Sequence, residues 1–155
     1  MNSYKPLSKR EKEDLLSELK KQFGVSHIDG VLLKRGAEKI FFFNGDLTMG
    51  EIDKLAINTQ IERLGVYFAK YQNNTFRLSL EGVWLLKDQI TKNIFEVNKE
   101  QMNLWMTGQE LNLETNKRGF LVIKYKEDFL GCGKASENKI SNFIPKSRRL
   151  RLKNG

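Results

Sequence analysis

Hydrophobic positions near the start of the chain recur with the period of an α-helix. Between positions 15 and 23, apolar residues are spaced three and four apart, which places them on one helical face. Ser8 and Glu11 form the pattern of a capping box, in which each side chain bonds to the backbone of the other residue. Gly24 is a typical residue just beyond a helix end. The pattern therefore predicts a helix over 9–23.

Short apolar runs bounded by turn residues continue through the first half of the chain, and they predict strands. The predicted strands occupy 31–33, 40–43, 64–71 and 76–80, and the predicted helices occupy 48–58 and 81–90. Two interpretations exist for Phe41, Phe42 and Phe43: a platform on which nucleic-acid bases stack, or a buried central strand. The unbroken apolar run favours the buried strand. Trp84 and Trp105 lie among apolar residues of predicted helices, which favours a core or domain-interface position over stacking.

The second half of the chain combines one predicted helix with several strands. Asn98 is a capping residue for the helix. The predicted helix occupies 99–107, and predicted strands occupy 119–125, 129–135 and 139–144. After Pro145, cations alternate with Leu150 and Leu152, which predicts a half-buried strand over 148–153 with its cations facing outward.

A polar break at 88–93 separates the two halves and predicts a domain boundary there. We expect an α+β protein with two domains: a mixed α/β domain over 1–92 and a small β-barrel with one helix over 93–155.

The net charge adds a function class to this picture. The chain of 155 residues has a formal charge of +8, and residues 131–155 hold seven cations and one anion, a net +6. Such a concentration attracts polyanions, which leaves nucleic acid, anionic membrane or an acidic protein as partner classes. No apolar run approaches the roughly 20 residues that span a bilayer. The start of the chain lacks the apolar stretch of a signal peptide, so we expect a cytoplasmic location and no membrane contact.

Catalytic constellations are not visible in the sequence. His27 is the only histidine and lies in a predicted loop, which favours an exposed or capping role. Cys132 is the only cysteine, and a strand position favours an inward-pointing side chain over a nucleophile. Gly131, Gly133 and Lys134 lack the full spacing of a P-loop. We expect no enzymatic activity, no cofactor and no metal.

Four motifs in the second half resemble, in their order, a PUA domain, an RNA-binding module named after pseudouridine synthases and archaeosine transglycosylases. The motifs are MTGQEL at 106–111, RGFLVI at 118–123, LGCGK at 130–134 and KISNFIPK at 139–146, the last followed by Arg148 and Arg149. The last motif looks especially like the C-terminal region of Sun/Fmu-type RNA cytosine-5 methyltransferases, and like archaeal stand-alone proteins related to that group. Residues 63–86 look like the pre-PUA region that accompanies such domains. The layout is also similar to a eukaryotic factor of large-subunit ribosome assembly.

The resemblance implies binding of structured tRNA or rRNA, in ribosome biogenesis or RNA modification. The methyltransferases' S-adenosylmethionine domain, with its glycine-rich loop and paired cysteines, has no counterpart in this sequence. The resemblance therefore implies RNA binding without catalysis. The RNA-binding residues that it implies are Lys117, Arg118, Gly119, Lys134, Asn142, Lys146, Arg148, Arg149 and Arg151.

Two other interpretations remain open. The aromatic residues of the first half, which carries little net charge, are also typical of a protein–protein interaction module that docks on a ribosomal or RNA-modifying partner. The basic terminus is also compatible with a solvated tail that keeps the protein soluble. The alternation of cations with Leu150 and Leu152 favours binding over solubility alone.

Overall fold

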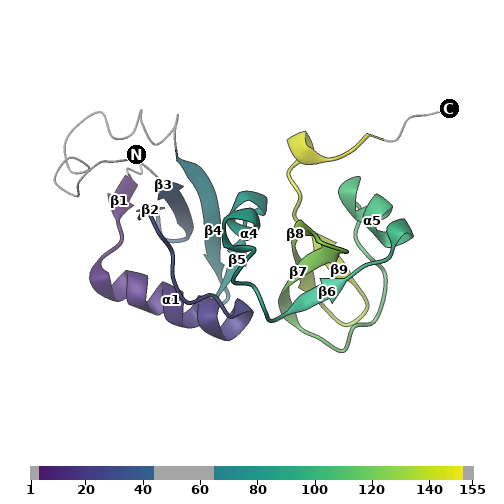
Figure 1. Cartoon of the computed structure of the whole chain (residues 1–155), viewed down its shortest axis with the longest axis horizontal. Helices are drawn as coiled ribbons and strands as arrows, with labels where there is room; N and C mark the ends of the chain where they lie inside the picture. The colour runs from purple at the N-terminus through teal and green to yellow at the C-terminus, as the bar shows by residue number, and fades with distance from the viewer. Residues whose placement is uncertain (1–3, 44–64, 152–155) are drawn as a thin grey trace.

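Two β-sheets with helices packed against them form the protein (Figure 1). The computed structural model describes residues 4–43 and 65–151. The first half forms a five-stranded antiparallel sheet with strand order β1-β2-β3-β4-β5. Its strands are β1 (Tyr4–Pro6), β2 (Val31–Arg35), β3 (Lys39–Phe43), β4 (Val66–Gln72) and β5 (Thr75–Leu78).

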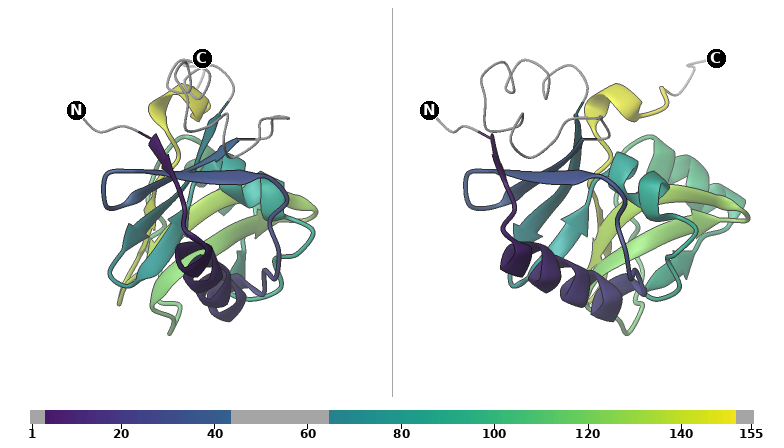
Figure 2. Two further views of the ribbon diagram at one scale, coloured as in Figure 1. Left: turned by 90° about the vertical axis from the view of Figure 1, so that its left-hand side faces the viewer. Right: turned by 60° about the vertical axis from the view of Figure 1, so that its left-hand side comes forward.

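Helix α1 (Lys9–Phe23) lies against one side of this sheet, as Figure 2 shows, and it confirms the first prediction from the sequence. The capping box is present: the Ser8 hydroxyl accepts from the Glu11 backbone, and the Glu11 carboxylate accepts from the Ser8 backbone. The Lys34 ammonium donates to Glu11 over 2.6 Å, and together with the cap it lowers the pKa of the Glu11 carboxyl. Gly24 ends the helix in the left-handed conformation.

Strand β3 is a central strand of the sheet, which confirms the buried interpretation for Phe42 and Phe43. Phe42 packs into the core that contains α1, whereas Phe43 packs with Leu33 on the opposite face. Phe41 is only partly buried, and its ring lies between the rings of Tyr4 and Tyr67 at 5.1 Å and 5.7 Å.

The second half forms a four-stranded sheet with strand order β6-β7-β8-β9. Strand β6 runs parallel to β7, and the other pairs are antiparallel. The strands are β6 (Ile94–Glu96), β7 (Gly119–Tyr125), β8 (Asp128–Ala135) and β9 (Ile140–Asn142), and the helix is α5 (Lys99–Met106). The mixed α/β composition agrees with the expected class. Within the described residues the sheet is open, so the closed barrel that we expected is not seen.

One buried hydrophobic cluster spans both halves, and a second cluster, which contains Trp105, lies within the second half. Helix α4 (Leu80–Leu86) lies between the sheets in Figure 1 and contacts β4 of the first and β8 of the second. Phe120, Val122 and Cys132 belong to the same buried cluster as α1. The backbone N–H of Thr91 also donates to the carbonyl of Phe23 over 2.8 Å. The two halves therefore pack tightly against each other. The domain boundary between residues 92 and 93 remains a prediction.

Most strand and helix predictions are confirmed to within a few residues, with two omissions and one error. The three-residue strands β1 and β6 were not predicted. The predicted helix over 48–58 lies outside the described residues.

The predicted strand over 148–153 is wrong for residues 148–151, the part of it that the structure describes. Residues Lys146–Arg148 form a 3-10 turn, η1, and the chain continues to Arg151 without a strand partner. The N–H of Leu150 donates to the carbonyl of Met106 over 2.7 Å, so the segment is tied to the end of α5 and not to a sheet edge. The Leu150 side chain is 58% exposed, so it does not pack into a hydrophobic core as a half-buried strand would require.

Candidate nucleic-acid interface

Four of the predicted RNA-binding residues gather where β7 begins and β8 ends, and we call them the β7 cluster: Lys117, Arg118, Gly119 and Lys134. Lys117 and Arg118 are exposed in the turn before β7. Gly119 has a φ of 86°, and a side chain there would meet no atom within 4 Å. Lys134 pairs across the strands with Phe120, one position beyond Gly119. The β7 cluster therefore brings together the exposed cations Lys117 and Arg118, the backbone of Gly119, which no side chain of the described residues covers, and the third cation, Lys134.

A cation from the first half joins this cluster through two aromatic rings. The Lys134 ammonium lies 5.8 Å from the ring centroid of Phe120. The Phe120 ring lies 6.3 Å from that of Phe143. The Arg77 guanidinium of β5 lies 4.3 Å over the other ring, Phe143. Sequence reasoning missed Arg77, because only the packing of the two halves brings this distant residue to the cluster.

Asn142 is engaged inside the protein. Its amide group donates to the carbonyl of Trp105 over 2.8 Å and to that of Gln109 over 3.0 Å. Its side-chain oxygen accepts from the backbone of Ile144 over 2.8 Å. Asn142 therefore fixes the chain after β9 against the end of α5, which is a positioning role.

The four predicted cations after Pro145 form a separate group, the terminal segment: Lys146, Arg148, Arg149 and Arg151. Arg148 forms an ion pair with Glu81 of α4 at 2.8 Å. Its guanidinium also lies 5.7 Å from the Trp84 ring centroid. Lys146 and Arg151 are exposed.

The Arg149 side chain packs against the protein itself, between Ile144 and Gly108. Its Nε donates to the carbonyl of Ile144 over 3.0 Å. A side chain at Gly108 would come within 2.5 Å of Arg149, so the glycine that ends the α5 region leaves room for the arginine. Lys146 and Arg151 are thus the members of the terminal segment best placed to meet a ligand.

The β7 cluster and the terminal segment lie at opposite ends of the second sheet. Arg148 stacks on Trp84, whose indole N–H donates to the carbonyl of Phe129 at the start of β8. Lys134 lies near the other end of β8, beside Ala135. Phe129 and Ala135 are six positions apart along β8, or about 20 Å. The structure thus divides the predicted site into two basic groups.

The two tryptophans differ from each other. Trp105 is 0% exposed, and its indole N–H donates to the carbonyl of Leu130 over 2.8 Å, which confirms a core position. Trp84 is 43% exposed, so of the two predicted positions, core or domain interface, it does not take the core one. Its hydrogen bond to Phe129 nevertheless links α4 to the second sheet.

The candidate catalytic residues take structural or surface positions. Cys132 is 3% exposed, and burial raises the pKa of its thiol to about 12, so the thiolate is scarce near neutral pH. The inward position agrees with the prediction. The His27 side chain is 64% exposed beside Asp29, also as predicted. Among the described residues, no three His, Cys, Asp or Glu side chains gather as a metal site would require.

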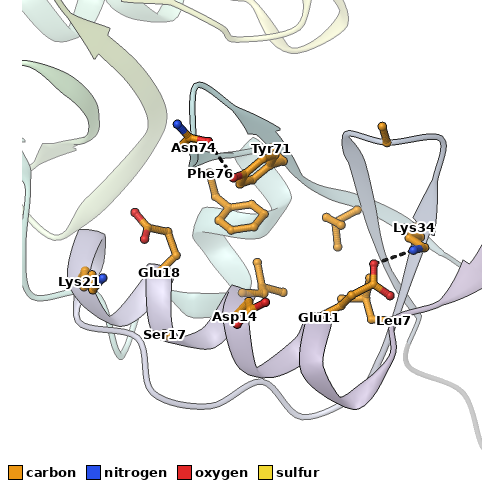
Figure 3. Close-up of a pocket in the computed structure, with 13 residues that line it drawn as sticks. Leu7, Glu11, Asp14, Ser17, Glu18, Lys21, Lys34, Tyr71, Asn74 and Phe76 are labelled. Carbon is orange, nitrogen blue, oxygen red and sulfur yellow. Dashed lines mark hydrogen bonds and ion pairs between the residues drawn. The ribbon is translucent and has the colours of Figure 1, made fainter.

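A hollow of about 470 Å³ lies between α1 and the strand ends on the α1 side of the first sheet (Figure 3). Its charged lining consists of the carboxylates of Glu11, Asp14 and Glu18 and the ammonium groups of Lys21 and Lys34. Three anions against two cations disfavour a phosphate ligand at this site.

Comparison with known proteins places the second half in context. Residues 92–150 match a family model described as the methyltransferase RsmF PUA domain. The chain is also similar to proteins named ribosomal RNA small subunit methyltransferase F. It is 27% identical to that of Psychromonas ingrahamii, over 88% of this chain and 29% of the relative. It is 24% identical to that of Aeromonas salmonicida, over 92% of this chain and 29% of the relative.

These comparisons confirm the predicted relation of the second half to the PUA region of Sun/Fmu-type methyltransferases. The chain spans 29% of the length of the first two relatives, and the likeness extends into its first half. The relatives are bacterial, so the expected likeness to archaeal stand-alone proteins stays a prediction. None of the described helices is long and apolar enough to cross a membrane.

Proposed function

We propose that this chain binds structured RNA through the β7 cluster and contributes RNA recognition to ribosomal RNA modification. One observation carries the proposal: the residues that match the PUA domain, 92–150, include the exposed cations of the β7 cluster. Cations on a rigid sheet end form a preorganised surface for phosphates. Recognition is mainly of shape and backbone, because RNA duplexes offer little readable sequence to side chains.

The terminal segment supplies a second contact at the other end of the sheet. Lys146 and Arg151 are exposed there, whereas Arg148 and Arg149 are held by Glu81 and Ile144. A structured RNA that reaches both groups extends over about 20 Å of protein surface. Gly119 allows the RNA backbone to approach the main chain of β7 closely.

Our proposal assigns RNA binding, and not methyl transfer, to these residues. The matched family model describes the PUA domain of the methyltransferase. Cys132, the single cysteine, is buried with a raised pKa and is therefore a poor nucleophile. The methyl-transfer step belongs, in this account, to a catalytic domain outside these residues.

The relatives' name makes small-subunit ribosomal RNA the first substrate to test, with tRNA as the second. Either RNA would place the protein in the cytoplasm and in ribosome biogenesis or RNA modification. Protein partners of the same machinery are compatible with this role.

The test is binding of the whole chain to labelled hairpins from small-subunit ribosomal RNA and to tRNA, followed by fluorescence anisotropy. We expect dissociation constants of micromolar order or tighter near physiological salt, since non-specific binding alone reaches roughly 10⁻⁴ to 10⁻⁶ M. Absence of binding to both RNAs would contradict the proposal. A pull-down after nuclease treatment separates it from the docking-module hypothesis, under which protein partners remain bound while RNA affinity is negligible.

A further inference from the structure

Four cations form a row across the first sheet. The strand register places Arg35 opposite Lys39, Lys39 opposite Lys70, and Lys70 opposite Arg77. Residues directly opposite each other on neighbouring strands share one face of the sheet. The row therefore crosses β2, β3, β4 and β5, and three strand spacings give it a length of about 14 Å. We call these residues the outer row: Arg35, Lys39, Lys70 and Arg77.

The outer row lies on the face of the sheet away from α1. Ile40, Ala69 and Phe76 are the strand neighbours of row members, and all three are buried in the core that α1 covers. Side chains alternate between faces along a strand, so the row points to the other side. The hollow of Figure 3, whose lining has more carboxylates than ammonium groups, is on the α1 side. The two faces of the sheet therefore differ in charge, and the outer face is the basic one.

Such a row is electrostatically unfavourable in the free protein. Like charges directly opposite on neighbouring strands destabilise a sheet, and the outer row contains three such pairs in succession. Within residues 4–43 and 65–151, the one ion pair made by the row joins Lys70 to Glu38 at 3.7 Å. A bound polyanion would remove this repulsion. Local features that cost stability without an evident structural gain are characteristic of functional sites.

The outer row is continuous with the β7 cluster. Arg77, its last member, stacks on Phe143, and Phe143 packs against Phe120. Lys134 of the β7 cluster lies over the Phe120 ring. One basic surface therefore runs from β2 of the first sheet across the junction of the halves to the beginning of β7.

Aromatic rings accompany the row on the same face. Phe41 shares the face of Lys39, and its ring contacts those of Tyr4 and Tyr67. All three rings are partly exposed. The Arg35 guanidinium lies 5.4 Å from the Tyr4 ring centroid. Cations that follow a sugar–phosphate backbone beside aromatic rings that accept bases are the combination that single-stranded nucleic acid requires.

We propose that the outer row binds a single-stranded RNA segment next to the structured element held by the β7 cluster. This inference rests on the proposed function and adds a second contact, made by the first half of the chain. The segment lies across the strands of the first sheet. Its phosphates meet Arg35, Lys39 and Lys70, and the stretch nearest the hairpin meets Arg77.

The experiment compares one hairpin with and without a single-stranded extension of roughly six nucleotides, a length typical of single-strand sites. The extension is placed on the 5′ end in one probe and on the 3′ end in another. We expect the wild-type chain to bind one extended probe about tenfold more tightly than the bare hairpin. A tenfold gain corresponds to about 1.4 kcal/mol, which the added phosphate contacts to Arg35, Lys39 and Lys70 share.

The variant Arg35→Gln/Lys39→Gln/Lys70→Gln is expected to lose this gain and to keep the wild-type affinity for the bare hairpin. Arg77 is left intact, because its guanidinium packs on Phe143 at the junction of the halves. The variant removes like-charge pairs, so we expect its urea midpoint to equal or exceed that of the wild type. The matched control is Lys9→Gln/Arg10→Gln/Lys20→Gln, three exposed cations of α1, and it should retain the gain.

Retention of the gain by the outer-row variant would overturn the inference, as would a wild-type chain that gains nothing from either extension. An equal loss in the α1 control would also overturn it, because the effect would then come from net charge alone. Failure of the wild type to bind the bare hairpin marks the different case in which the proposed function itself is wrong.

Discussion

The variant Lys117→Gln/Arg118→Gln/Lys134→Gln is expected to bind a structured RNA hairpin about 100-fold more weakly than the wild type. Each exposed cation–phosphate pair contributes about 1 kcal/mol at the upper end of the range for surface ion pairs, and 1.4 kcal/mol corresponds to tenfold in affinity. Lys117 and Arg118 are exposed, and no ion pair to either is found in the described part of the chain. Their loss should therefore leave the fold intact. Anisotropy titrations give the affinities, and urea unfolding verifies the fold.

The matched control for the β7-cluster variant is again Lys9→Gln/Arg10→Gln/Lys20→Gln, which removes two lysines and one arginine from α1. Both variants have the same net charge, so non-specific attraction falls equally in the two. We expect less than threefold weakening in the control. Equal weakening in both variants would show that RNA responds to net charge and that the β7 cluster is not the binding surface.

The variant Trp105→Ala is expected to lose about 4 kcal/mol of unfolding free energy, within the range for truncating a buried aromatic residue. Trp105 is the largest fully buried side chain, and it packs against Gly133, where an added Cβ would lie 2.6 Å from the indole. The substitution also removes the donor to the Leu130 carbonyl. In urea, a loss of this size lowers the midpoint by roughly 2 M. A variant that unfolds during purification confirms the direction, and Trp105→Phe, which keeps an aromatic ring but removes the indole N–H and part of the buried ring system, then gives a smaller, measurable loss.

Trp84→Ala is the matched control for the tryptophan prediction. Trp84 also lies on a helix and also donates its indole N–H to a carbonyl of β8, that of Phe129. Trp84 is 43% exposed, far more than Trp105, so we expect a smaller loss of about 1 kcal/mol, on the order of one hydrogen bond. Equal losses for Trp84→Ala and Trp105→Ala would contradict the core position of Trp105 as the reason for its larger effect.

The sequence predicted those helices and strands well whose formation depends on residues close together in the chain. The capping box of Ser8 and Glu11 and the apolar spacing behind it defined α1, because both depend on neighbours within four residues. Strands β7 and β8 likewise agree with the predicted strands over 119–125 and 129–135. Strands β1 and β6 were missed, because three-residue edge strands carry too little pattern and depend on their partners for pairing.

The candidate site was predicted in part, and the gaps have physical causes. Alternation around Leu150 was read as a strand, but the backbone bond to Met106 and the packing of Arg149 on Gly108 hold that segment at the end of α5. The density of cations along the sequence predicts a basic site only where the cations are neighbours in the chain. The outer row is not predicted in this way, because Lys39 and Lys70 come together only through the register of β3 and β4.

The salt dependence of RNA binding tests the central claim most directly. The account has the protein neutralise about four phosphates of a structured hairpin. With roughly 0.7 ions released per phosphate of a single strand and roughly 0.9 per phosphate of a duplex, the logarithm of the association constant should fall with the logarithm of salt at a slope between about −3 and −4. The β7-cluster variant should show a slope shallower by about 2 to 3, since three contacts are removed. An affinity that stays flat from low to high salt in the wild-type chain would contradict phosphate recognition as the basis of its function.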